Sequence, residues 1–215
     1  MGVRLKDPFA AVSHWVGLAL ALAGTSWLAS ASLDKPLHLF AFTVYGLGVM
    51  ALYGASATYH SLHGRGWWAG GLQKLDHAAI FVMIAASYAP LCLIAIRGAT
   101  GMAMLGFQSA FAVIGVTLTM KLKKVPGLVR VILYLTMGWM AVFVLGPLSR
   151  SVPAAGLGWL VAGGVVYTVG AVIYVTDRPS LWPGRFSAHD LWHVFVLAGS
   201  ACHFVLFARF LAPAQ

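Results

Sequence analysis

Seven continuous apolar runs, separated by short polar loops, are the feature that most limits what this chain of 215 residues can fold into. Each run is about 20 residues long, the length that a helix needs to cross the hydrocarbon core of a bilayer. None shows the alternating pattern of a membrane-spanning β-strand. The pattern predicts an all-α bundle of seven transmembrane helices in a single domain. The runs are Phe9–Ser32, Leu37–His60, Asp76–Ile96, Thr100–Met120, Leu128–Leu148, Ala155–Val175 and His189–Ala212.

The composition excludes an ordinary soluble protein. Hydrophobic residues make up 60% of the chain and charged residues only 9%, whereas soluble domains carry about 25% charged residues. So few charges cannot cover a surface that faces water, and we expect lipid to surround the bundle. The net charge of +9 is interpreted as a sign of membrane topology and of contact with anionic lipid, not as a nucleic-acid surface.

The distribution of Lys and Arg predicts the orientation of the bundle, because cytoplasmic loops carry the excess of positive charge. A cytoplasmic N-terminus places four of these residues on the outer side, namely Lys35, Arg97, Arg150 and Arg209. The other ten then face the cytoplasm, namely Arg4, Lys6, Arg65, Lys74, Lys121, Lys123, Lys124, Arg130, Arg178 and Arg185. We therefore expect the N-terminus inside and the C-terminus outside.

Two histidines, His189 and His193, lie four residues apart at the start of the last run. In a helix they share one face and are about 6 Å apart along the axis. Neutral imidazole is the commonest protein ligand for a metal such as zinc. The pair therefore indicates a metal site whose other ligands come from elsewhere in the chain.

The expected topology brings further polar residues to the same membrane level. His60 ends the second run, Asp76 opens the third, and Ser56 precedes His60 by one helical turn. Three nitrogen ligands and a water form the arrangement of catalytic zinc sites, and a carboxylate beside that water can take its proton. Ser56 is expected to donate a hydrogen bond to His60 or to a substrate carbonyl.

A simpler interpretation is that these residues only line the lipid headgroup zone, with Asp76 favouring the dipole of its helix. Their coincidence at one depth favours a functional site, because ionisable groups at membrane depth are costly. His14 either lines the same cavity or bonds to a neighbouring helix, and the second interpretation is favoured. His203 lies about 15 Å beyond His193 along the helix, too far to share its metal, and is expected to be packed or hydrogen-bonded.

Three blocks of the sequence resemble the signature blocks of the bacterial haemolysin III family. They are SATYH at Ser56–His60, KLDHAAIFVMIAASYAP at Lys74–Pro90 and HDLWHVFVLAGSACHF at His189–Phe204. Further likeness at Ser13–Leu20, Leu133–Trp139 and Gly163–Val175 extends the resemblance over nearly the whole chain. This family belongs to the superfamily of progestin and adipoQ receptors and is more distantly related to alkaline ceramidases. The resemblance implies a multi-pass protein of the bacterial inner (plasma) membrane with a cytoplasmic N-terminus.

The resemblance also implies a zinc site. In the adiponectin receptors three histidines hold zinc and an aspartate contacts the zinc-bound water. Matched by motif, the ligands here are His60, His189 and His193, and the water partner is Asp76. Asp190 stands where bacterial members often have Glu, and no consequence for the metal is expected.

These patterns favour a zinc-dependent hydrolase of a lipid amide or ester at the cytoplasmic side of the membrane. Asp76 would act as general base and Ser56 would assist it, and a membrane lipid is the expected substrate or ligand. A second interpretation is a non-enzymatic protein of lipid homeostasis or sensing, in which zinc is structural. A haemolytic pore, implied by the name of the family, is less favoured, because the sequence has no amphipathic pore-lining stretch and no ring of charges.

Overall fold

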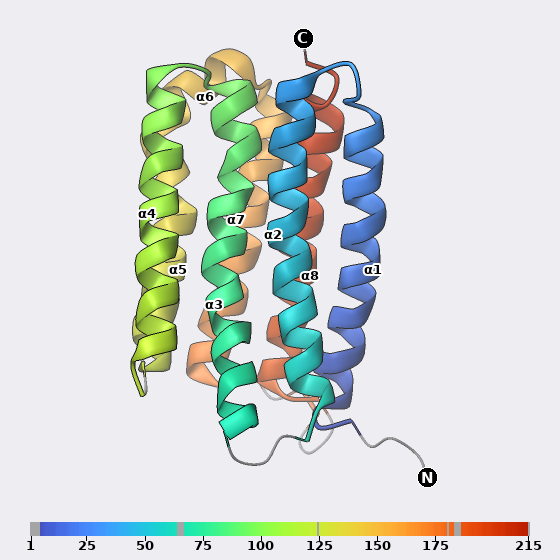
Figure 1. The fold of residues 1–215 in the computed structure, drawn as a ribbon, viewed down its shortest axis with the longest axis vertical. Helices are drawn as coiled ribbons and strands as arrows, with labels where there is room; N and C mark the ends of the chain where they lie inside the picture. Colours follow the sequence, from blue (N-terminus) through green and yellow to red (C-terminus); the bar gives the residue numbers. More distant parts are fainter. Residues whose placement is uncertain (1–4, 64–66, 124, 180, 183–185, 215) are drawn as a thin grey trace.

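The computed structural model describes residues 5–63, 67–123, 125–179, 181–182 and 186–214. Its helices run side by side in one bundle (Figure 1). Within the described residues seven helices are long and apolar enough to cross a membrane, which confirms the expected all-α bundle. The elements are α1 (Pro8–Ser30), α2 (Pro36–Ser61), α3 (Trp67–Pro90), η1 (Leu91–Ala95), α4 (Ala99–Lys121), α5 (Gly127–Trp139), η2 (Met140–Val144), α6 (Leu145–Ser151), α7 (Ala154–Thr176), α8 (Ala188–Leu206) and η3 (Phe207–Leu211).

The N-terminus and the C-terminus lie at opposite ends of the bundle (Figure 1), as an odd number of crossings requires. Which end faces the cytoplasm stays a prediction from the distribution of Lys and Arg. Four of the residues in that distribution, Arg4, Arg65, Lys124 and Arg185, lie outside the described residues.

The helices begin and end within a few residues of the apolar runs, with α3 as the exception. The prediction that Asp76 opens the third helix is wrong, because α3 begins at Trp67, about two and a half turns earlier. This first part of α3 contains two glycines and Lys74, so its hydropathy is low although its backbone is helical. The Lys74 ammonium donates a hydrogen bond of 2.8 Å to the carbonyl of Met120 near the end of α4.

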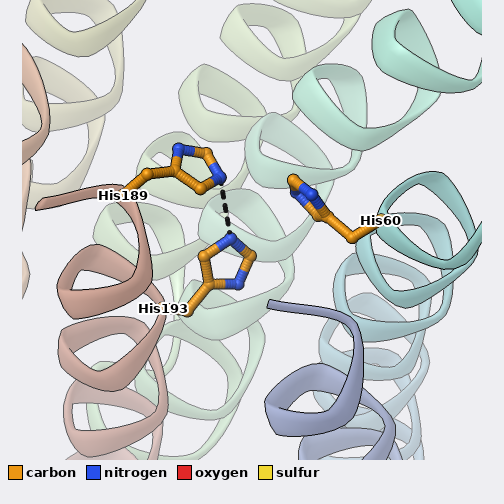
Figure 2. Close-up of side chains that lie close together, drawn as sticks. All are labelled: His60, His189 and His193. Carbon is orange, nitrogen blue, oxygen red and sulfur yellow. Dashed lines mark hydrogen bonds between the residues drawn. The ribbon is translucent and has the colours of Figure 1, made fainter. Parts of the chain in front are cut away.

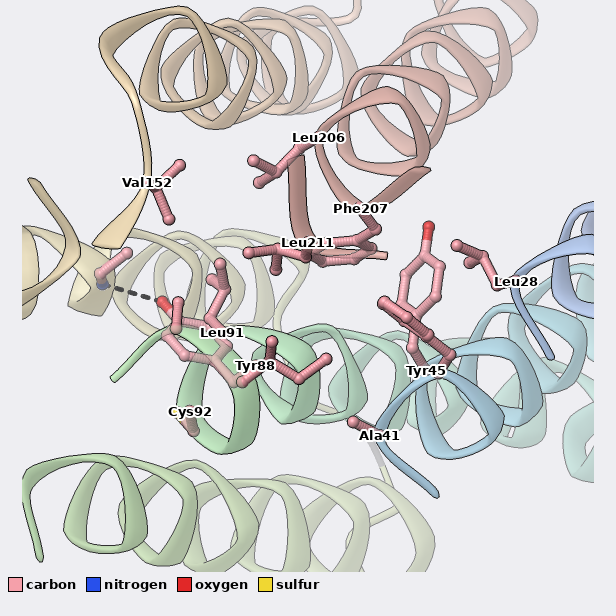
Figure 3. Packing of buried hydrophobic residues seen from close by; sticks show 14 of the residues in the cluster. Leu28, Ala41, Tyr45, Tyr88, Leu91, Cys92, Val152, Leu206, Phe207 and Leu211 are labelled. Carbon is pink, nitrogen blue, oxygen red and sulfur yellow. Dashed lines mark hydrogen bonds between the residues drawn. The ribbon is translucent and has the colours of Figure 1, made fainter. Parts of the chain in front are cut away.

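The main buried apolar cluster reaches η3 near the end of the chain, and Figure 3 shows part of this cluster. Phe207 packs edge-to-face on Tyr45 of α2, with ring centroids 4.8 Å apart, and Leu211 belongs to the same cluster. The outer surface is apolar too, since Leu20 and Val113 are 63% and 67% exposed. A surface of this kind is suited to contact with acyl chains, so packing against lipid replaces hydration.

The fifth crossing is not a regular α-helix, because the 3₁₀ segment η2 separates α5 from α6. Two buried polar side chains bond to the backbone at this point. The Tyr88 hydroxyl accepts a hydrogen bond of 2.9 Å from the amide of Ala141 and donates one of 2.8 Å to the carbonyl of Met137. The Gln108 amide donates to the same carbonyl at 2.8 Å. These bonds stabilise the segment, because an unsatisfied backbone group in a membrane costs several kcal/mol.

We expect Tyr88→Phe to lower the free energy of unfolding by about 1–3 kcal/mol, since it leaves the buried Ala141 amide without its acceptor. Tyr134→Phe is the matched control, because it removes one hydrogen bond of 2.8 Å to the carbonyl of His77 and strands no donor. Thermal unfolding in detergent measures both. Equal losses in the two variants would contradict the role given to Tyr88.

Candidate metal centre

The two histidines of α8 lie in the first turns of a helix with a complete capping box. The Ser187 hydroxyl accepts a hydrogen bond of 3.1 Å from the Asp190 amide, and the Asp190 carboxylate accepts one of 2.8 Å from the Ser187 amide. Asp190 therefore caps the helix backbone. This turn directs His189 and His193 toward each other, with their Nε2 atoms 3.0 Å apart (Figure 2).

His60 reaches the same point from the last turn of α2 (Figure 2). The ligand nitrogens of His60, His189 and His193 all lie within 4.8 Å of one another. The Nε2 atom of His60 is buried and has no hydrogen-bond partner among the described residues. Nitrogen ligands of a tetrahedral zinc ion, at 2.0–2.1 Å from the metal, are about 3.3 Å apart. The spacing and the unpartnered nitrogen therefore fit a group that can hold a metal ion.

The opposite ring nitrogens of two of these histidines are bonded to residues of the N-terminal segment. The Nδ1 atom of His60 donates a hydrogen bond of 2.8 Å to the Asp7 carboxylate. The Nδ1 atom of His193 lies 2.8 Å from the Nε2 atom of His14. Burial raises the pKa of Asp7, but the hydrogen bond with His60 and the charge of Lys6 outweigh it, and the net pKa is below its usual value. Because their Nδ1 atoms are bonded in this way, His60 and His193 present their Nε2 atoms to the centre of the three-histidine group.

The expectation that His14 bonds to a neighbouring helix is confirmed by its contact with His193 of α8, and His14 also lines the cavity beside the site. Asp7 is a functional candidate that the sequence analysis misses. It stands 53 positions from its partner His60, so no local spacing connects the two. The available signal is that Asp7 precedes His14 by seven residues, which places both on one face of a helix two turns apart.

Asp76 and Ser56 lie beside the three histidines. Their side chains are buried, with Asp76 8% and Ser56 2% exposed, and both line the cavity beside the histidines. The Nδ1 atom of His60 bonds to Asp7 and its Nε2 atom has no partner among the described residues, so Ser56 does not donate to His60 here. Among the described residues, the group of candidate ligand atoms contains the three histidines without Asp76. The carboxylate is therefore a neighbour of the histidine group and not a member of it.

A cavity of about 180 Å³ begins at this site. His193 and Asp76 line one part of it, and His203 of α8 and Phe207 of η3 line another. Most of its other lining side chains are apolar. The ring of His203 packs edge-to-face on Tyr167, with centroids 5.5 Å apart, which confirms the expected packed histidine.

The cavity is close to the outer surface between the fifth and sixth crossings. Trp139, Val142 and Val161 line it, and the same residues are 38%, 49% and 45% exposed on the bundle. The Trp139 indole donates a hydrogen bond of 3.0 Å to the hydroxyl of Thr168 on α7. The same side chains therefore line the cavity and reach the outer surface of the bundle.

Fold and site together define a seven-helix membrane protein with a three-histidine group, of which His60 and His193 are buried. Residues 3–204 match the family described as Haemolysin-III related, and the chain belongs to that family, within the superfamily of progestin and adipoQ receptors. It is therefore a multi-pass bacterial membrane protein.

Curated relatives cover almost the whole chain. The chain is 31% identical to "Hemolysin-3 homolog" of Bacillus subtilis (strain 168), over 93% of this chain and 92% of the relative. It is 30% identical to "Hemolysin-3" of Bacillus cereus, over 94% and 90%. The "Heptahelical transmembrane protein ADIPOR2" of Oryza sativa subsp. japonica is 31% identical, over 75% of this chain and 78% of the relative.

We expect Ser187→Ala to lower the free energy of unfolding by about 1 kcal/mol, because it removes the cap of the helix that carries His189 and His193. Ser149→Ala is the matched control, since its exposed hydroxyl bonds to the carbonyl of Gly146 within its own helix. Thermal unfolding in detergent compares the two. A stability loss no larger than that of the control would show that the cap does not hold this turn.

Proposed function

We propose that this protein is a zinc-dependent hydrolase that cleaves a lipid amide or ester at the cytoplasmic side of the membrane. The observation that carries the proposal is the meeting of three histidine nitrogens beside a buried carboxylate, at one part of an apolar cavity. Three protein ligands are typical of catalytic zinc sites, which keep the fourth position for water or substrate. Structural zinc sites usually have four protein ligands.

The residues of the site have separate roles in this proposal. His60, His189 and His193 hold the ion as neutral imidazoles. Zinc, when bound, supplies Lewis acidity toward a carbonyl oxygen and lowers the pKa of water to about 7. Asp76 accepts the proton of the attacking water and returns it to the leaving amine or alcohol as general acid. Ser56 lines the cavity together with Asp76 and assists it.

The cavity supports a lipid as the substrate. Side chains such as Ile84, Leu91 and Val196 line it and make it suitable for an acyl chain. Trp139, Val142 and Val161 line the cavity and are also exposed on the bundle. In this proposal an acyl chain enters from the bilayer beside these residues, with its carbonyl end toward the histidines.

Purified wild-type protein is expected to contain one zinc ion per chain, because the three histidines together supply the ligands of one site. The variants His60→Ala, His189→Ala and His193→Ala are each expected to lose it. His38→Ala is the matched control, since His38 is buried on the same helix as His60 but near its other end. Elemental analysis measures the metal. Folded wild-type protein without zinc, or full occupancy in the three variants, would refute the site.

Asp76→Asn is expected to lower hydrolysis by about 10²–10⁴-fold, because an amide cannot act as general base. Zinc content should stay unchanged, since Asp76 is not a member of the histidine group. The assay follows release of a fluorescent acyl chain from an amide lipid and from an ester lipid in detergent micelles. Asp34→Asn, in the loop between α1 and α2, is the control. Full hydrolysis by the metal-stripped protein would contradict the proposed mechanism.

A structural zinc is the second candidate, and one observation favours it. The three histidines come from α2 and α8, and the hydrogen bonds of Asp7 and His14 add α1, so an ion here would tie the two ends of the chain together. In that case the histidine variants would lose thermal stability, while neither fluorescent lipid would be cleaved by the zinc-loaded wild type. Cleavage that depends on both zinc and Asp76 separates the two candidates.

A further inference from the structure

The N-terminal end of α1 provides no candidate metal ligand, yet it contacts two of the three histidines. Asp7, at the N-cap of α1, bonds to His60 of α2, and His14, two turns later, bonds to His193 of α8. Residues seven positions apart lie on one face of a helix. A single face of α1 therefore reaches both helices that carry the three-histidine group.

His14 fixes the proton position on His193. The Nε2 atom of His193 faces His189 in the three-histidine group, so it must keep its lone pair to bind a metal. A neutral imidazole then carries its proton on Nδ1, and this proton is donated to the Nε2 atom of His14, 2.8 Å away. His14 is only 2% exposed. Water therefore cannot easily replace it as the acceptor.

Asp7 fixes the proton position of His60 in the same way, and it makes a second contact with the backbone of His60. Its carboxylate accepts the Nδ1 proton of His60 at 2.8 Å, and its own amide donates to the carbonyl of His60 at 3.0 Å. Neighbouring contacts hold the segment in place. The Lys6 ammonium lies 3.6 Å from the centroid of the Tyr59 ring, and Phe9 packs edge-to-face on Phe186, just before α8.

The approach of α1 to α8 depends on a glycine one turn after His14. A Cβ atom at Gly17 would lie 2.8 Å from a Leu197 side-chain carbon and 2.9 Å from a ring carbon of Tyr53. A larger side chain at this position would require Leu197 or Tyr53 to move. The absence of a side chain at Gly17 allows His14 to reach His193.

We propose that Asp7 and His14 are positioning residues of the metal centre, which set the proton position and the orientation of His60 and His193. This inference rests on the proposed zinc site and extends it to a helix that has no ligand. Hydrogen-bond partners of metal-binding histidines raise the basicity of the ligand and keep its ring in place. Retention of the metal then depends on how α1 packs.

The test measures the zinc affinity of the purified full-length chain in detergent, by competition with a chromogenic chelator. His14→Leu and Asp7→Ala are each expected to weaken zinc binding by about 10–100-fold. His14→Gln is expected to stay within about threefold of the wild type, because its amide oxygen can take the place of the imidazole acceptor. Ser13→Ala is the matched control, since its hydroxyl bonds only to the carbonyl of Ala10 in the same helix.

The outcomes separate this inference from the proposed function. Zinc affinities of His14→Leu and Asp7→Ala within twofold of the wild type would overturn the inference and leave the zinc site standing. A wild-type protein that binds no zinc would overturn both. If His14→Leu does not fold, Asp7→Ala decides by the same criterion, because the side chain of Asp7 is 41% exposed and its loss leaves no cavity. Equal weakening in His14→Gln and His14→Leu would also contradict the role of the acceptor.

Discussion

The meeting of three imidazole rings, each with a nitrogen atom within 4.8 Å of the others, is the interaction on which the site depends. Polar atoms inside a lipid-facing bundle are costly unless they find a partner. Asp7 and His14 satisfy the outer nitrogens of His60 and His193, whereas the Nε2 atom of His60 is buried without a partner among the described residues. A divalent ion would complete this set of bonds. The same ion would join α2 to α8, so chemistry and stability would share one site.

The requirement to satisfy polar groups also shapes the opposite wall of the cavity. The fifth crossing departs from regular helix at η2, and there Tyr88 and Gln108 bond to its backbone. Irregular backbone at membrane depth is tolerated only where protein or water replaces the missing bonds. The distorted turn carries Val142 on the cavity wall and at the outer surface. The polar residues that support the break therefore also position a residue that lines the cavity.

The sequence predicts the seven crossings because each must be a continuous apolar run, and it predicts the three histidines because their helix ends fall at one membrane level. It does not predict the start of α3, since the first turns of this helix contain Lys74 and two glycines and are therefore not hydrophobic. The break at η2 is missed by the apolar pattern, because Met140–Val144 is as apolar as the helix around it; its sequence signal is Pro147, which has no amide to bond to the carbonyl of Phe143. Asp7 is missed because its bond to His60 arises only when α1 packs beside α2.

X-ray absorption at the zinc edge tests most directly whether three histidines meet at one ion. In wild-type protein we expect three imidazole nitrogens at about 2.0–2.1 Å and one further oxygen. His60→Ala should remove one imidazole from the zinc shell or abolish zinc binding. A sulfur shell near 2.3 Å, or a spectrum unchanged by His60→Ala, would contradict the three-histidine centre.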